Sequence, residues 1–175
     1  MEVKSDLAER GTENTLAIAT LGEAARYLGP RAVEENKRLS ILRDELEIQL
    51  KEIIPDCEVN GSGSPRVANT SNMSFKEIDG ETLLINLDTR GFAVSSGAAC
   101  SSGSQEPSPV LRAMGLTSEE ASQSLRISLG WLTTDADVRD FIANLKDSVA
   151  KMRESRRQMM AEQMLTDEAE SEVSL

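Results

Sequence analysis

Apolar residues recur at helical spacing in two long stretches of the chain. In residues 31–54, leucine or isoleucine returns every three or four positions, while glutamate, lysine and arginine fill the other faces. The second stretch begins at a Thr134–Asp137 capping box and keeps this spacing to Met152. The two sets are Leu39, Leu42, Leu46, Leu50 and Ile53, and Val138, Phe141, Ile142, Leu145, Val149 and Met152. Each set forms one apolar stripe, which predicts a helix packed on a core.

Further helices are predicted from start and stop signals. A helix is expected over residues 14–27, and Gly29 followed by Pro30 separates it from the next one. Three shorter helices are expected to begin after residue types that cap helix starts, at Asp79, Ser108 and Thr117.

Four short segments have the pattern of β-strands. They are Cys57–Asn60, Thr70–Phe75, Phe92–Ser95 and Ser124–Leu129. In the last segment, Leu125, Ile127 and Leu129 share one face while Arg126 lies on the other, which is typical of a half-buried strand. The predicted fold class is α+β, with a small antiparallel or mixed sheet of about four short strands and helices packed on one face.

The length of 175 residues suits one core and not two. We expect a lead-in segment over residues 1–13 and one folded domain over 14–153. Residues 154–175 are rich in methionine and then acidic, and we expect this tail to fray.

Charge and composition narrow the function classes. With 19 basic and 30 acidic residues the net charge is −11, which argues against nucleic acid or an anionic membrane as a partner. No apolar stretch approaches the ~20 residues of a membrane span, and the first residues lack a signal-peptide core, so a cytoplasmic location is expected. Histidine is absent, which removes the commonest general base, and the spacing of the two cysteines suggests no metal site.

Cys100 lies within a tract of small residues, SSGAACSSGS, that follows the third predicted strand. Such a tract can be a simple flexible linker, or it can carry a thiol on a solvated loop to meet a partner. Cys57 follows a long packed helix into a strand, so we expect it to be a structural thiol.

Five motifs resemble, in the same order, the C-terminal (small) domain of a cysteine desulfurase, the sulfur-mobilising branch of the class V aminotransferase family. They are Arg10–Asn14 (RGTEN), Asn72–Phe75 (NMSF), Ser95–Cys100 (SSGAAC), Glu106–Ser108 (EPS) and Leu125–Gly130 (LRISLG). The long loop between Cys100 and Pro107 resembles the branch that serves iron–sulfur cluster assembly and tRNA thiolation. The resemblance implies the fold of the small domain of fold-type I pyridoxal-phosphate enzymes.

The resemblance also implies roles for four residues. Cys100 would be the catalytic cysteine, which takes the sulfur of L-cysteine as a persulfide and leaves L-alanine. Arg126 and Asn72 would bind the substrate, with the Arg126 guanidinium on the carboxylate. Thr12 would contact the phosphate of pyridoxal 5'-phosphate across a dimer interface. Taken alone, the residues favour a surface salt bridge for Arg126 and allow a helix-start hydroxyl for Thr12.

The sequence departs from the family in the part that holds the cofactor. The family binds pyridoxal phosphate on the lysine of a Ser-x-His-Lys segment, and no lysine of this sequence lies in such a motif. We therefore expect no covalently bound cofactor and no activity from this chain alone, because the large domain is missing from the sequence. A stand-alone persulfide carrier and an inactive truncated product are the alternatives. The partners implied for the complete homodimeric enzyme are L-cysteine and a sulfur acceptor, such as an iron–sulfur scaffold or a tRNA-thiolation protein.

Overall fold

The computed structural model describes residues 13–96 and 107–173. The chain divides into two compact units, Met1–Glu35 and Asn36–Leu175, and the boundary falls within the first helix. In chain order the elements are α1 (Thr15–Ile53), β1 (Cys57–Val59), β2 (Thr70–Phe75), α2 (Gly80–Asp88), β3 (Ser95–Ser96), α3 (Pro109–Ala113), α4 (Ser118–Ser122), β4 (Ser124–Ser128) and α5 (Asp135–Val173).

The described part of the first unit is the beginning of α1. The Asn14 carboxamide accepts a hydrogen bond from the Ala17 N–H at 3.0 Å and caps the helix. The predicted break at Gly29–Pro30 is wrong, because Pro30 lies inside a continuous helix. Pro30 removes one intrahelical donor, and the Arg31 guanidinium donates to the Tyr27 carbonyl at 2.9 Å in the same turn. Because Pro30 has no N–H, one carbonyl of the preceding turn lacks its helical donor. This turn is exposed, so water can solvate that carbonyl.

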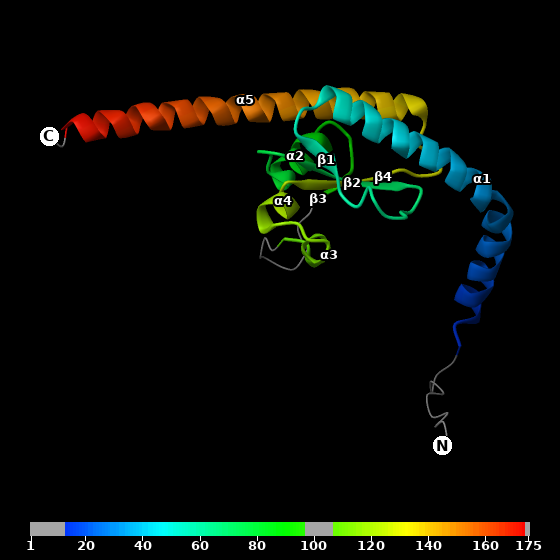
Figure 1. Cartoon of the computed structure of the whole chain (residues 1–175). Coiled ribbons are helices and arrows are strands. Elements are labelled where there is room, and N and C mark those ends of the chain that lie inside the picture. Colours follow the sequence, from blue (N-terminus) through cyan, green and yellow to red (C-terminus); the bar gives the residue numbers. More distant parts are fainter. Residues whose placement is uncertain (1–12, 97–106, 174–175) are drawn as a thin grey trace, which may run out of the picture. The chain divides into compact units, whose positions relative to one another are not determined.

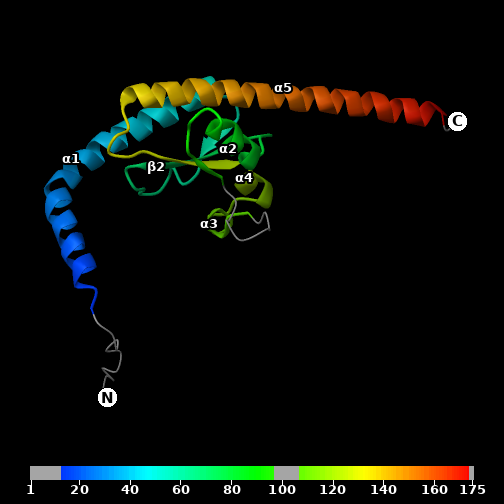
Figure 2. The same cartoon turned by 180° about the vertical axis from the view of Figure 1, so that it is seen from behind.

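The second unit is built on a four-stranded sheet with the order β1-β2-β4-β3. All three strand pairs are antiparallel. Figures 1 and 2 show α5 and the later part of α1 on one side of the sheet, with α3 and α4 on the other side. The predicted α+β class and the small sheet of four short strands are confirmed.

The core lies between the sheet and the two predicted apolar stripes. Leu46, Leu50 and Leu145 are fully buried against Met73 of β2 and Leu125 of β4. Burial of each such side chain contributes about 1.5–3 kcal/mol relative to an exposed position, so these stripes dominate the packing energy. The opposite face of the sheet is therefore left to polar residues.

A partly buried ion pair fastens α1 to the loop between β1 and β2. The Arg66 guanidinium donates two hydrogen bonds to the Glu47 carboxylate, at 2.7 and 2.9 Å. Arg43 donates to the Val67 carbonyl of the same loop at 2.6 Å. Burial raises the pKa of Glu47, but the hydrogen bonds and charge of Arg66 outweigh it and hold the pKa below its ordinary value.

The expected capping residues occupy helix starts. The Asp79 carboxylate accepts from the Thr82 N–H at 2.7 Å, and Thr117 forms a reciprocal capping box with Glu120. The Thr134 and Asp137 side chains likewise exchange hydrogen bonds with each other's backbone N–H at the start of α5.

Two details of the predicted strands differ in the structure. The third strand pairs only at Ser95–Ser96, because the preceding Phe92 and Val94 diverge from β4 and pack against the core. Ser124 begins β4 on the polar face, yet it is fully buried. Its hydroxyl donates to the Glu120 carbonyl of α4 at 2.7 Å, which compensates the burial.

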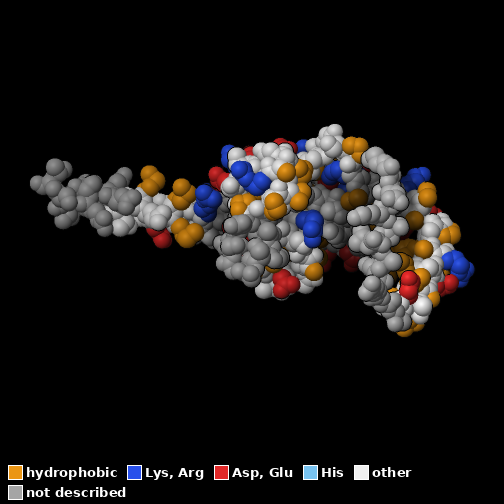
Figure 3. All heavy atoms as spheres, turned by 90° about the horizontal axis from the view of Figure 1, so that it is seen from below, with side chains coloured by type: hydrophobic (Ala, Val, Ile, Leu, Met, Phe, Trp, Pro, Cys, Tyr) orange, Lys and Arg blue, Asp and Glu red, His pale blue; other side chains and the backbone are white. Residues whose placement is uncertain are grey.

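The helix α5 continues to Val173, through the segment that the sequence pattern assigned to a tail. Side-chain pairs such as Arg157 with Glu154 support it locally. Its apolar side chains beyond the core are exposed, and Figure 3 shows them on the left among charged groups. These side chains are Met159, Met160, Met164 and Leu165. No helix within residues 13–96 and 107–173 is long and apolar enough to cross a lipid bilayer.

Cys57 belongs to the core, as a structural thiol should. It is buried where β1 begins, and its Sγ donates to the Leu50 carbonyl across 3.6 Å. Burial raises the pKa of the Cys57 thiol, and the charge of Glu58 adds to this shift. A thiol with a raised pKa and little access to solvent is a poor nucleophile.

We predict that Gly80→Ala destabilises the fold. A Cβ atom at Gly80 would lie 2.6 Å from the Ser122 carbonyl oxygen and 2.9 Å from that of Ser124, so backbone must move. The expected loss in the free energy of unfolding is about 1–3 kcal/mol, measured by urea denaturation. Gly63→Ala is the control, since a Cβ there meets no atom within 4 Å. Equal stability of the two variants would contradict this close approach.

We predict that Cys57 reacts with iodoacetamide at least about tenfold more slowly than Cys100 in the folded chain, because the thiolate form of Cys57 is disfavoured and shielded. Timed alkylation followed by peptide mass spectrometry measures both rates in one sample. In denaturant the two rates should converge. A native rate for Cys57 that already matches its denatured rate would show that this thiol is not in the core.

Candidate functional site

Four polar residues lie in one row across the open face of the sheet. Asn72 of β2 and Ser95 of β3 both pair with Arg126 of β4, one on each side. Asn60 directly follows β1, and its N–H donates to the Asn72 carbonyl at 2.8 Å, which places it beside Asn72. Directly paired residues share a face, with Cβ atoms about 4.5–5.5 Å apart. We call Asn60, Asn72, Arg126 and Ser95 the polar row.

The apolar residues of β2 and β4 place the row on the open face. Met73, Leu125 and Ile127 are buried in the core. Side chains alternate along a strand, so Asn72 and Arg126 must point to the opposite side. Arg126 is exposed there and Asn72 is half-buried. A charged guanidinium is stable in this position because it keeps its solvation.

Hydrogen bonds within the row fix its two ends. The Arg126 Nη2 donates to the Ser95 hydroxyl at 3.1 Å. The Asn60 amide nitrogen donates to the Asn72 side-chain oxygen at 2.6 Å. A guanidinium has five N–H donors, so the bond to Ser95 orients Arg126 and leaves donors for a ligand. This geometry suits a planar anion such as a carboxylate.

The structure brings together two of the four residues that the sequence predicted for the site. Arg126 and Asn72 are direct cross-strand neighbours. Within the described residues, Arg126 donates to a hydroxyl instead of forming the surface salt bridge that the residues alone favour. Cys100 and Thr12 lie outside the described residues. The chain enters the Cys100 segment directly after β3, the strand that carries Ser95.

Sequence reasoning missed the two ends of the row, Asn60 and Ser95. Ser95 opens the SSGAAC motif, but the sequence pattern indicates only a strand end there. Asn60 precedes Gly61, and this pair predicts only a strand that leads into a loop. Asn60 becomes recognisable once strand register is known, because it then lies next to Asn72.

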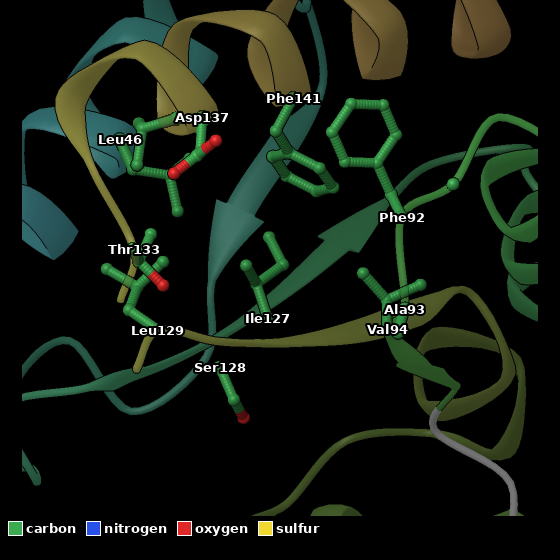
Figure 4. A pocket seen from close by; sticks show the side chains of 12 residues that line it. Leu46, Phe92, Ala93, Val94, Ile127, Ser128, Leu129, Thr133, Asp137 and Phe141 are labelled. Atoms are coloured by element: carbon green, nitrogen blue, oxygen red, sulfur yellow. The ribbon is translucent and has the colours of Figure 1, made fainter. Parts of the chain in front are cut away.

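A pocket of about 270 Å³, lined by both apolar and polar residues, opens where Phe92 and Val94 separate from β4. Figure 4 shows Phe92 and Phe141 on one side of it and Ile127 at its centre. The Phe92 and Phe141 rings meet edge to face, with centroids 5.5 Å apart. The carboxylate of Asp137, also in the lining, is bound by Thr134, whose N–H and hydroxyl lower the pKa of Asp137. This pocket therefore offers shape and apolar surface but no acid or base free for chemistry.

A larger hollow of about 630 Å³ lies beside Asn60 and Ser74. Its lining is acidic, with four carboxylates and one lysine: Asp56, Glu58, Glu119, Glu120 and Lys76. The negative charge disfavours an anion in this hollow. An anionic ligand is therefore better placed over Arg126 than at the Asn60 end of the row.

The described residues do not make a site that would hold pyridoxal phosphate covalently. A lysine that does so needs a lowered pKa, which requires desolvation or a nearby cation. The lysines within the described ranges are exposed. They are Lys37, Lys51, Lys76, Lys146 and Lys151.

Comparison with known proteins identifies relatives of the whole domain. A family model described as aminotransferase class V matches residues 3–141. The cysteine desulfurase of Trichormus azollae is 45% identical over 143 residues, which are 82% of this chain and 36% of that protein. The cysteine desulfurase NifS of Azotobacter vinelandii is 39% identical over 143 residues, with the same coverage of each chain. The chain thus spans about a third of the length of these relatives.

A solved structure supports the same relationship. The NifS-like protein of Rickettsia africae superposes with a TM-score of 0.67 at 33% identity, over 79% of this chain and 35% of that one. The similarity thus covers most of this chain and about a third of that one. The chain therefore belongs to the class V aminotransferase family, and these relatives within it are cysteine desulfurases.

Proposed function

We propose that this chain is the C-terminal portion of a cysteine desulfurase and that it supplies the sulfur-accepting thiol and the carboxylate site of the substrate. The observation that carries the proposal is the pairing of Arg126 with Asn72 on the open face of the sheet. Both residues come from motifs that resemble the desulfurases, and the relatives that match the chain bear that name.

In this proposal Cys100 receives the sulfur. The Cys100 sulfur bonds to the sulfur of L-cysteine as the Cβ–S bond of the substrate breaks. One L-cysteine and one thiol give one L-alanine and one persulfide, so atoms and electrons balance without an external oxidant. The Arg126 guanidinium holds the carboxylate meanwhile, through parallel N–H donors that match the two oxygens.

The pyridoxal phosphate chemistry belongs to the part of the enzyme that this sequence does not contain. The described lysines are exposed, so we assign no step on the cofactor to them. We propose that the remaining part binds the cofactor, and that in a homodimer Thr12 contacts its phosphate from the neighbouring subunit.

A stand-alone persulfide carrier is a weaker proposal. A carrier needs a reactive thiol, but it has no use for a site that binds the carboxylate of free cysteine. The Arg126–Asn72 pair therefore favours a part of the enzyme. Two relatives have the names IscS and NifS, and we propose that the persulfide passes to an acceptor such as an iron–sulfur scaffold or a tRNA-thiolation protein.

We predict that the chain restores cysteine desulfuration when the remainder of the enzyme is supplied as a separate polypeptide, taken from the Trichormus azollae relative. The mixture should release alanine from L-cysteine, and mass spectrometry should find one added sulfur on Cys100. Cys100→Ser should abolish the persulfide, because a hydroxyl is a poor nucleophile without an adjacent base.

Cys57→Ser is the matched control and should leave alanine release unchanged, since Cys57 is buried in the core away from the polar face. A persulfide on Cys57 alone, or its persistence in Cys100→Ser, would overturn the proposed role of Cys100.

A further inference from the structure

We propose that Asn60 is a positioning residue that turns the side-chain N–H groups of Asn72 toward Arg126. The substrate carboxylate then meets donors from β2 as well as from β4. This inference rests on the proposed function, because the carboxylate is that of the cysteine substrate. It depends on four linked hydrogen bonds that begin at a backbone carbonyl of α4 and run through Ser124, Ser74 and Asn60 to Asn72.

The backbone of Asn60 is held firmly. Its N–H donates to the Asn72 carbonyl at 2.8 Å and so extends the β1–β2 ladder by one residue. Gly61 follows with a φ of 76°, which lets the chain turn out of the sheet directly after Asn60. The side chain is thus presented to β2 from a fixed position.

Ser124 determines which way the side-chain amide of Asn60 is turned, that is, where its nitrogen and its oxygen lie. The Glu120 carbonyl can only accept, so the Ser124 hydroxyl donates its proton there, at 2.7 Å. The Ser124 oxygen then acts as an acceptor, for the Ser74 hydroxyl at 3.0 Å and toward the Asn60 amide nitrogen, 3.2 Å away. The Ser74 hydroxyl has one proton, so when it donates to Ser124 its oxygen accepts from the Asn60 amide nitrogen, 2.8 Å away.

The orientation of the Asn72 side-chain amide follows from that of the Asn60 amide. The Asn60 nitrogen lies 2.6 Å from the Asn72 side-chain oxygen, so this oxygen is the acceptor. In the sheet, β1 and β4 flank β2 on opposite sides. Because the oxygen of Asn72 points toward Asn60 beside β1, its amide nitrogen lies on the side of β4, where Arg126 is the direct partner.

This orientation matters for the charge that the site can bind. An Asn72 amide turned the other way would present oxygen lone pairs beside Arg126 and repel a carboxylate. With the inferred orientation, an anion over Arg126 meets N–H groups from two strands, and hydrogen bonds to a charged group are about twice as strong as neutral ones. Asn60 contributes by selecting the orientation and needs no contact with the substrate.

The first test uses the whole 175-residue chain and acetate or L-alanine as the carboxylate probe. In ¹H–¹⁵N spectra, the side-chain N–H signals of Asn72 and the Nε–H of Arg126 should shift together with one apparent Kd. Asn69 is an internal reference, because its amide nitrogen donates to the Leu129 carbonyl and should not respond. Shifts at Arg126 without shifts at Asn72 would overturn the inference.

The second test compares Asn60→Ala with Asn60→Asp in the same titration. Removing the bond that orients Asn72 should weaken carboxylate binding by about three- to tenfold in Asn60→Ala. Asn60→Asp should weaken it further, because a carboxylate there accepts from Asn72 and reverses its amide. Wild-type affinity in Asn60→Ala, whatever the aspartate variant does, would show that Asn60 does not position Asn72.

The two proposals fail in different ways. The titrations report binding to the chain alone and need no turnover. Failure of alanine release with normal Asn72 shifts would contradict the desulfurase proposal and leave a carboxylate site. Normal alanine release with unresponsive Asn72 signals would contradict only the role of Asn60.

Discussion

The antiparallel pairing of β2 with β4 is the constraint on which the candidate site depends. Five consecutive residue pairs join these strands, and Asn72 opposite Arg126 is the central one. A slip of β4 by one residue would move Leu125 into solvent and bury the Arg126 guanidinium in the core. Hydrophobic burial and the cost of burying a charge therefore select the same register, and that register assembles the polar row.

The polar side of the sheet is organised by a buried hydroxyl. Ser124 is fully buried between β4 and α4, and its bond to the Glu120 carbonyl fixes which way its oxygen faces. Through Asn60 this direction reaches Asn72, so in the proposed carboxylate site a helix end acts without touching the ligand. The close approach of Gly80 to Ser122 and Ser124 keeps this corner compact. Packing and the proposed ligand recognition thus share the same residues.

Much of the fold could be predicted because it follows from local periodicity. The leucine stripe of α1, the capping box at Thr117 and the exposed Arg126 between buried neighbours all agree with the sequence pattern. The continuous helix through Pro30 could not be predicted, since the local rule favours a break. The role of Asn60 was also hidden, because a residue's cross-strand partner depends on register between segments distant in sequence.

The central claim is that Arg126 binds the substrate carboxylate, and substrate discrimination tests it most directly. In the two-polypeptide enzyme, KM would be measured for L-cysteine and for L-cysteine methyl ester, whose carboxylate charge is blocked. Arg126→Ala should raise KM for cysteine by a factor of about 10–100, the value of a lost charge-assisted bond, and leave KM for the ester nearly unchanged. An equal rise for both substrates, or no rise for cysteine, would contradict the account.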